Sequence, residues 1–307
     1  MILAKSGIFG FSQCIKNDRH DISPTSCGGH PFVAVKYCTA GTPRGIVPRI
    51  VQSPWLTQSL RDLRSTTVTA VDGVGLWFAE LATLGSLLSS PDDMELLSAA
   101  ELARANAMQA VDVRRDFLVS RILLRSVLGA CLGAVPKSLT FSISEHGKPM
   151  LAATAAQGTL HFNISHSRSA WLLGVTRRAP VGIDIETRSH VENSARLASR
   201  VFSLTEVTEL DSALDRDAAF LRGWTRKEAV LKAAGSGFTW VARDIDVGTG
   251  AVHRRVELPA RVHSVADVWS FEPPIAGYAA VALLSDAAAR PPDRIDDCIV
   301  YRRIIAV

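Results

Sequence analysis

The sequence predicts an α+β protein built as a pseudo-dimer of two similar halves, with a ligand site in the cleft between them. Three observations support this: a composition suited to a large core, a pattern of helix and strand signals that occurs twice, and acidic and basic residues grouped late in that pattern. The chain has 307 residues, of which 47% are apolar and 21% charged. Such a chain can bury a sizeable core in one large domain or two small ones.

The helix signals come in two matching sets. Capping boxes of the form Ser-x-x-Glu start at Ser98 and Ser203, and each should begin a helix. A longer helix pattern follows each box, at residues 114–129 and 218–234. The two sets are about 105 to 110 residues apart, a spacing that fits a duplicated small domain better than a solenoid unit.

Strand-like segments complete each half and extend the repeat. They lie at residues 139–143, 162–165 and 171–175 in the first half and at 244–247, 269–271 and 279–283 in the second. Two similar halves would meet at a cleft, which is a preferred place for a ligand.

Residues 1–70 mix Gly, Pro, Ser and Thr without a sustained period, which predicts a poorly ordered N-terminal extension. We therefore expect the first half to occupy residues 71–180 and the second half residues 181–307.

Charge and cysteine content limit the partners and the compartment. The formal net charge of +4 and the pI of about 8.9 favour anionic partners, but no basic run with interleaved aromatic residues indicates nucleic-acid binding. The 5 cysteines lack metal-type spacing, and their odd number argues against a complete disulfide framework. With no apolar run long enough to span a bilayer, we expect a cytoplasmic protein that does not bind membranes.

The segment Val181 to Glu186 places two carboxylates side by side. On a strand, Asp184 and Glu186 share one face while Ile183 and Ile185 pack on the other. Paired carboxylates suit hard oxygen ligation of Mg²⁺, although two surface acids on a half-solvated strand would give the same pattern.

A helix pattern about forty residues later carries a third acid. Trp224, Glu228 and Lys232 follow one another at i, i+4 and i+8, so they line one face, and a glycine at 235 or 237 ends the helix. By itself this is an ordinary Glu–Lys surface pair beside a buried tryptophan. Facing the two-acid strand, it would complete a site for a metal-bound pyrophosphate.

Two further segments carry polar groups suited to phosphate. Phe162 to Ser167 offers two hydroxyls and the imidazole of His166, and no Gly-x-Ser-x-Gly elbow supports a hydrolase. Lys148 stands in a turn before Pro149, where it could pair with a phosphate, although a solvated turn lysine is commoner.

In this order and approximate spacing, the motifs resemble those of the Sfp-type 4′-phosphopantetheinyl transferases. The motifs are Gly147-Lys148-Pro149, Phe162-Asn163-Ile164-Ser165-His166-Ser167, Gly182-Ile183-Asp184-Ile185-Glu186 and Trp224-x-x-Lys227-Glu228-x-x-x-Lys232. The resemblance covers residues 71–290 and implies the 4′-phosphopantetheinyl transferase fold, with coenzyme A in the cleft between the halves.

The resemblance also implies roles for individual residues. Asp184, Glu186 and Glu228 would hold Mg²⁺ against the pyrophosphate of coenzyme A, Glu228 would be the general base, and Lys232 would steady the leaving phosphate. The implied contacts to coenzyme A come from Lys148, Pro149, Ser165, His166, Lys232 and, by a looser alignment, Arg115, with His166 and Arg115 near the 3′-phosphate.

The implied reaction moves phosphopantetheine from coenzyme A to a serine of an apo acyl or peptidyl carrier protein and releases 3′,5′-ADP. Carriers of fatty acid, polyketide and nonribosomal peptide synthesis all remain candidates. A monomer is expected, because two halves already supply the cleft.

Two other functions are compatible with parts of the sequence. A non-catalytic module of the same fold would bind coenzyme A or a carrier without transfer. A general Mg²⁺-dependent nucleotide phosphotransferase is the other, but the sequence has no Gly-x-x-x-x-Gly-Lys-Ser/Thr loop.

Overall fold

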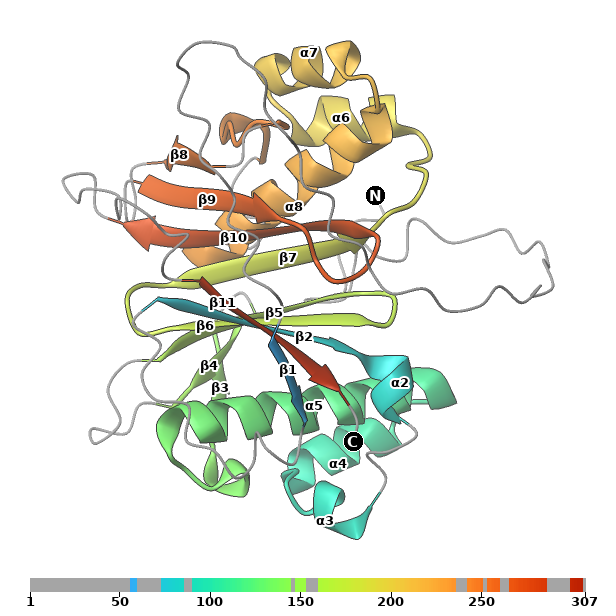
Figure 1. Cartoon of the computed structure of the whole chain (residues 1–307), viewed down its shortest axis with the longest axis vertical. Helices are drawn as coiled ribbons and strands as arrows, with labels where there is room; N and C mark the ends of the chain where they lie inside the picture. The colour runs from blue at the N-terminus through green and yellow to red at the C-terminus, as the bar shows by residue number, and fades with distance from the viewer. Residues whose placement is uncertain are drawn as a thin grey trace.

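The computed structural model of the chain describes residues 56–59, 73–85, 90–144, 147–152, 160–235, 242–250, 253–259, 265–285 and 299–305 (Figure 1). The predicted extension, residues 1–70, lies outside these ranges except for Leu56–Ser59, which form a strand. None of the described helices is long and apolar enough to cross a membrane.

The first described elements run up to residue 176; Leu56–Ser59 lies in the predicted extension, and the others lie in the predicted first half. In chain order they are β1 (Leu56–Ser59), β2 (Val74–Glu80), α2 (Leu81–Gly85), α3 (Pro91–Met94), α4 (Ala99–Asn106), α5 (Val111–Leu132), the 3₁₀ turn η1 (Pro136–Ser138), β3 (Phe141–Ile143), β4 (Pro149–Leu151), β5 (His161–Ser167) and β6 (Ala170–Thr176).

The remaining elements belong to the predicted second half. They are β7 (Val181–Thr187), α6 (Ser194–Val201), α7 (Leu204–Ser212), α8 (Arg216–Ala234), the 3₁₀ turn η3 (Ala242–Asp244), β8 (His253–Glu257), β9 (Val265–Phe271), β10 (Gly277–Ser285) and β11 (Ile299–Ile305).

Two sheets pack face to face, with helices on their outer faces (Figure 1). The first sheet has the order β1-β11-β2-β6-β5 and the second β7-β10-β9-β8, while β3 and β4 form a separate pair. Alternate residues of β2 pack into different cores. Leu76 lies between the sheets and Trp77 lies under α5. The architecture is therefore the predicted α+β fold of two halves.

Both predicted capping boxes are confirmed. Ser98 accepts the backbone N–H of Glu101 at the start of α4, and Ser203 accepts that of Glu206 at the start of α7. In each box the glutamate side chain also accepts the N–H of the serine, which satisfies two donors that a helix start leaves unpaired. The predicted longer helices correspond to α5 and α8.

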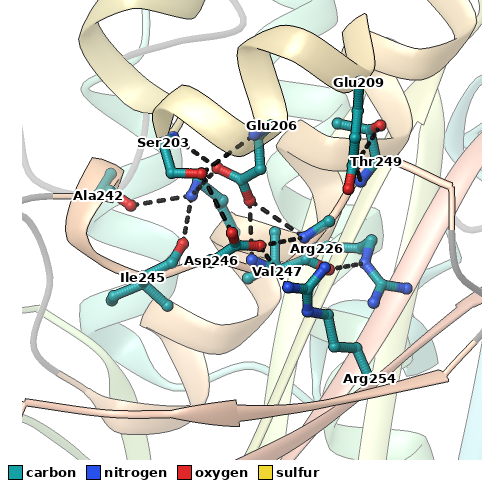
Figure 2. Close-up of polar contacts among 12 residues, drawn as sticks. Ser203, Glu206, Glu209, Arg226, Ala242, Ile245, Asp246, Val247, Thr249 and Arg254 are labelled. Atoms are coloured by element: carbon teal, nitrogen blue, oxygen red, sulfur yellow. Dashed lines mark hydrogen bonds and ion pairs between the residues drawn. The ribbon is translucent and has the colours of Figure 1, made fainter. Parts of the chain in front are cut away.

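The two capping glutamates also form ion pairs outside their own helices. Glu101 pairs with Arg121 and Arg125 of α5, and Glu206 pairs with Lys227 of α8 at 2.7 Å. Figure 2 shows the contacts around Glu206, whose second oxygen accepts the N–H groups of Val247 and Gly248. The glutamate of each capping box therefore stabilises the start of its own short helix and also binds the longer helix that follows.

One predicted strand is wrong. Residues 244–247 alternate polar and apolar side chains, but Asp244 ends η3 and the next residues form no strand. Their backbone is held by Glu206 through Val247 rather than by a neighbouring strand. Alternation alone could not reveal this partner, which lies about forty residues earlier in the chain.

The last strand lies in the first sheet. β11 runs parallel to both β1 and β2 and sits between them. We predicted that residues 181–307 form the second half, so the pairing of β11 with strands of the first sheet was not expected. Parallel pairing between distant segments leaves no local pattern in the sequence.

Candidate active site

The paired acids Asp184 and Glu186 lie on β7, on the face that α8 covers. Ile183 and Ile185 alternate with them and are buried between the two sheets. Asp184 is buried and Glu186 is partly exposed. The alternation of the strand therefore separates the core-forming residues from the ionisable ones.

A glycine on the same face lets α8 approach the strand closely. A Cβ at Gly182 would overlap the carbonyl oxygen of Ala229 and the backbone nitrogen of Ala233. α8 begins at an N-cap aspartate, Asp215, and ends at Gly235, whose φ of 65° is left-handed and therefore favours glycine. Any other residue at 182 would push the helix, and with it Glu228 and Lys232, away from β7.

Lys232 is the cation of the site. Its Nζ lies 2.6 Å from Oδ1 of Asp184 and 4.0 Å from Oε2 of Glu228. Burial alone would lower the pKa of Lys232, but the carboxylates of Asp184 and Glu228 outweigh burial and raise it. The ammonium group therefore stays charged and links the strand to the helix.

The two remaining acids hold their protons more tightly than usual. The pKa of Glu186 rises to about 7 because partial burial removes water from the carboxyl group and because Asp184 lies close, although a hydrogen bond from Ser167 opposes the rise. The pKa of Glu228 also rises to about 7, again because of burial, while Lys232 opposes the rise and Asp184 adds to it. Three crowded acids share a single nearby ammonium group, and this favours a further cation.

One carboxylate oxygen of this cluster lacks a partner. Oδ2 of Asp184 is buried and has no hydrogen-bond partner, while Oδ1 accepts from both Ser165 and Lys232. Within the part of the chain that the structure describes, no three His, Cys, Asp or Glu side chains form a group that could hold a metal ion. The acids Asp184, Glu186 and Glu228 carry carboxylate groups, the type of ligand that hard cations bind.

β5 meets β7 through side chains. Ser165 donates to Oδ1 of Asp184 at 2.7 Å, and Ser167 donates to Oε2 of Glu186 at the same distance. Since β5 belongs to the first sheet and β7 to the second, the candidate site lies where the two halves meet.

His166 points to the other face of β5. Its Nε2 lies 3.0 Å from Oγ of Ser120 on α5, and the indole N–H of Trp171 donates to the same hydroxyl. Burial lowers the pKa of His166 to about 4, with smaller contributions from Lys232 and Arg121. The imidazole is therefore neutral at pH 7.

Lys148 ties the β3–β4 hairpin to the second half. Its Nζ donates to the carbonyl oxygens of Val181 at 3.0 Å and of Lys232 at 2.6 Å. Burial, reinforced by Lys232, lowers the pKa of Lys148 to about 8. Its neighbour Pro149 is the first residue of β4 and pairs with Ile143.

Arg115 packs its aliphatic chain against Gly85 of α2 and pairs its charge within α5. Its guanidinium pairs with Asp112 and Asp116, both on α5, and 36% of the side chain is exposed. Most of the predicted site residues are linked to one another by direct contacts or by electrostatic effects on their pKa values: Asp184, Glu186, Glu228, Lys232, Lys148, Ser165 and His166. Among the described residues, no polar contact from Arg115 to this group is found.

Sequence reasoning gave no individual role to Ser167 or Asn163, although the alternation of polar residues through β5 contains a signal for both. Ser120 gives no such signal, because it is an ordinary serine within a helix pattern.

Family sequence profiles match both halves of this fold. The profile described as 4′-phosphopantetheinyl transferase, N-terminal, matches residues 92–175, and the one described as 4′-phosphopantetheinyl transferase superfamily matches residues 180–269. The two matches, one in each half, indicate a 4′-phosphopantetheinyl transferase fold of two halves.

Similar proteins extend this result. The chain is 39% identical to the 4′-phosphopantetheinyl transferase HetI of Nostoc sp. over 168 residues, which cover 54% of this chain and 70% of HetI. It is 38% identical to AcpT of Salmonella typhimurium over 154 residues (49% and 74%), and 32% identical to the 4′-phosphopantetheinyl transferase of Bacillus subtilis over 124 residues (40% and 53%). The chain belongs to the 4′-phosphopantetheinyl transferase family, whose enzymes transfer the phosphopantetheine group of coenzyme A.

Proposed function

We propose that this chain transfers 4′-phosphopantetheine from coenzyme A to a serine of an apo acyl or peptidyl carrier protein. The observation that carries the proposal is the contact of Asp184 on β7 with Lys232 on α8, beside Glu228 and next to an unpaired, buried carboxylate oxygen. The carboxylates would bind a cation that accompanies the substrate, and the ammonium group of the lysine would bind the pyrophosphate of the substrate.

Asp184, Glu186 and Glu228 would hold Mg²⁺ in this proposal. Their oxygens are hard ligands, and the buried Oδ2 of Asp184 has no hydrogen-bond partner and could therefore bind a cation. When bound, the metal would neutralise negative charge on the pyrophosphate oxygens.

The proton of the carrier serine would pass to Glu228. The raised pKa of this carboxyl group reflects its burial and suits an acid–base role near neutral pH. The serine oxygen then forms a bond to the phosphorus that bears pantetheine. The phosphoanhydride bond breaks, and its electron pair leaves with 3′,5′-ADP.

Lys232 would stabilise the departing phosphate. It is one helical turn beyond Glu228, it is charged, and its flexible side chain already reaches across to β7. The surrounding residues add positioning and electrostatic stabilisation, which provide most of the rate increase in phosphoryl transfer.

Contacts to the nucleotide end of coenzyme A belong to the same proposal. Ser165 adjoins Asp184, and His166 lies on the opposite face of the same strand as a neutral hydrogen-bonding group. Lys148 and Pro149 come from the neighbouring hairpin, and the partly exposed Arg115 remains the proposed partner of the 3′-phosphate.

We also propose that the enzyme acts as a cytoplasmic monomer and that it requires neither nucleic acid nor a membrane. The two packed sheets support the monomer, because both sides of the site come from one chain. Light scattering during size-exclusion chromatography tests it, and a dimer at micromolar concentration would contradict it.

Intact mass spectrometry of an apo carrier protein tests the activity directly. After incubation with the enzyme, coenzyme A and Mg²⁺, the carrier should gain the mass of one phosphopantetheine group, and EDTA should prevent the gain. Coenzyme A binding without any gain, across acyl and peptidyl carriers, would instead support the non-catalytic module.

A further inference from the structure

Strands β5 and β7 are joined by a ladder of side chains. They are edge strands of different sheets, and three polar side chains of β5 accept the backbone N–H groups of alternate residues on β7. Oδ1 of Asn163 accepts from Ile183 at 2.9 Å, Oγ of Ser165 from Ile185 at 3.4 Å, and Oγ of Ser167 from Thr187 at 3.1 Å.

The two serines do more than accept. Each hydroxyl also donates to the carboxylate of the β7 residue just before its N–H partner. Ser165 thus binds Asp184, and Ser167 binds Glu186, both at 2.7 Å. A serine hydroxyl has one hydrogen, so accepting from the backbone directs that hydrogen toward the acid. The ladder therefore fixes both the spacing of the strands and the orientation of the two carboxylates.

Asn163 shows that these two effects are separable. It holds the N–H of Ile183 in the same way, but the residue before Ile183 is Gly182, which has no side chain to orient. The ladder contact at Asn163 joins the sheets and touches no acid.

Ser167 is buried too deeply to meet a substrate. Only 3% of the residue is exposed, and its hydroxyl is satisfied by Thr187 and Glu186. Among the proposed metal ligands, the one that Ser167 contacts is Glu186. Ser165 is a less informative residue, because it also contacts Lys232.

We propose that Ser167 is a positioning residue that holds the carboxylate of Glu186 in the orientation required for metal binding. This inference rests on the proposed metal site of Asp184, Glu186 and Glu228. Groups that hydrogen-bond a metal ligand from behind fix its direction, and their loss typically weakens metal binding about 10- to 100-fold.

Direct titration of the full-length protein with Mn²⁺, followed by the electron paramagnetic resonance signal of the free ion, tests the proposal without turnover. Ser167→Ala should bind Mn²⁺ at least about 10-fold more weakly than the wild type. Ser167→Thr, which restores the hydroxyl, should recover most of the affinity. In assays, Ser167→Ala should require more Mg²⁺ for half-maximal rate, while the KM for the carrier protein stays nearly constant.

Asn163→Ala is the matched control. It removes a ladder contact from the same face of the same strand, and only 5% of Asn163 is exposed. Thermal unfolding in EDTA should show that both alanine variants lose stability, but Asn163→Ala should keep wild-type affinity for Mn²⁺. Ser167→Cys keeps the volume and replaces the hydroxyl by a weak donor, so it gives the same comparison if Ser167→Ala does not fold.

The outcomes separate this inference from the proposed function. If the wild type binds Mn²⁺ and Ser167→Ala binds it equally well, the positioning role is wrong while the metal site stands. Equal loss of affinity in Ser167→Ala and Asn163→Ala would also overturn it, because the ladder would then act only by joining the sheets. A wild type that binds no Mn²⁺ removes the metal site and this inference together.

Discussion

Glu228 combines burial, a neighbouring cation and a neighbouring acid in one side chain. Its carboxyl group lies 4.0 Å from Lys232 and has a pKa raised to about 7. The same group serves as a metal ligand and as a base in the proposed mechanism. Substitutions at this residue therefore test both roles at once.

Glu228→Gln should reduce kcat by at least about 100-fold, because glutamine keeps the shape of the side chain but cannot accept a proton. Coenzyme A binding, measured by calorimetry, should be partly retained. Initial rates of carrier modification give the comparison.

Glu257→Gln is the control for this loss, since Glu257 is an exposed acid on β8. It should behave as the wild type. Near-normal turnover by Glu228→Gln would exclude Glu228 from both proposed roles.

His166 makes the stability of the fold sensitive to acid. The folded protein binds a proton at His166 only near pH 4, whereas the unfolded chain does so near the usual pKa of 6.5. The unfolding free energy is therefore highest above pH 6.5 and falls as the pH drops toward 4, by roughly 2 to 3 kcal/mol from this group.

Urea unfolding of the wild type and His166→Gln at several pH values measures this contribution. The variant should lose about 2 to 3 kcal/mol less than the wild type between pH 6.5 and 4. His190→Gln, at an exposed histidine paired with Asp217, should follow the wild type. Parallel curves for the wild type and His166→Gln would show that His166 is not held neutral.

The sequence predicted part of the site at this scale. Period-two alternation on β7 and the four-residue spacing on α8 were enough to predict that Asp184 and Glu186 share a face and that Glu228 and Lys232 lie together. The carbonyl partners of Lys148 could not be predicted, because they come from Val181 and Lys232, far along the chain. The aspartates that bind Arg115 were visible only as neighbours in sequence.

At the scale of elements, each short helix after a capping box anchors a longer helix. Glu206 and Lys227 form the more enclosed of the two anchors, with 0% and 2% of their side chains exposed. A buried ion pair that loses one partner leaves an uncompensated charge, which typically costs about 3 to 5 kcal/mol.

Glu206→Gln should therefore lower the unfolding free energy by about 3 to 5 kcal/mol in urea titrations. Ser203→Ala, which removes only the serine half of the same capping box, should cost about 1 kcal/mol. Lys227→Met added to Glu206→Gln should restore part of the loss. If Glu206→Gln costs no more than Ser203→Ala, the ion pair contributes little beyond the cap.

Local signals predicted α4, α5, α7 and α8, because caps and apolar periods act within a few residues, but they did not predict α2, α3 or α6. The segment 244–247 shows where such signals fail. Its backbone N–H at Val247 bonds a glutamate of α7, so a long-range hydrogen bond replaces the strand that alternation suggested.

At the scale of the whole molecule, the first sheet depends on the last described segment of the chain. β11 separates β1 from β2 and pairs with both. A stop codon after residue 298 should leave β2 as an open edge, which promotes association with other chains.

Size-exclusion chromatography with light scattering should find this truncated protein aggregated or oligomeric, and its melting temperature should fall. A stop after Ile305, which keeps β11, is the control and should give the wild-type profile. A monomeric truncated protein with an unchanged melting temperature would mean that the first sheet is stable without β11.

The position of β11 also bears on how the protein is made. During synthesis, β2 and its helices leave the ribosome long before β11 exists, so the first sheet waits unfinished while the whole second half is translated. Contacts between such distant segments close slowly, and the exposed strand edges of a nascent chain attract other proteins meanwhile. A chaperone that covers the edge of β2 until translation ends would raise the yield of active enzyme, and a pause near the end of the message would lower it.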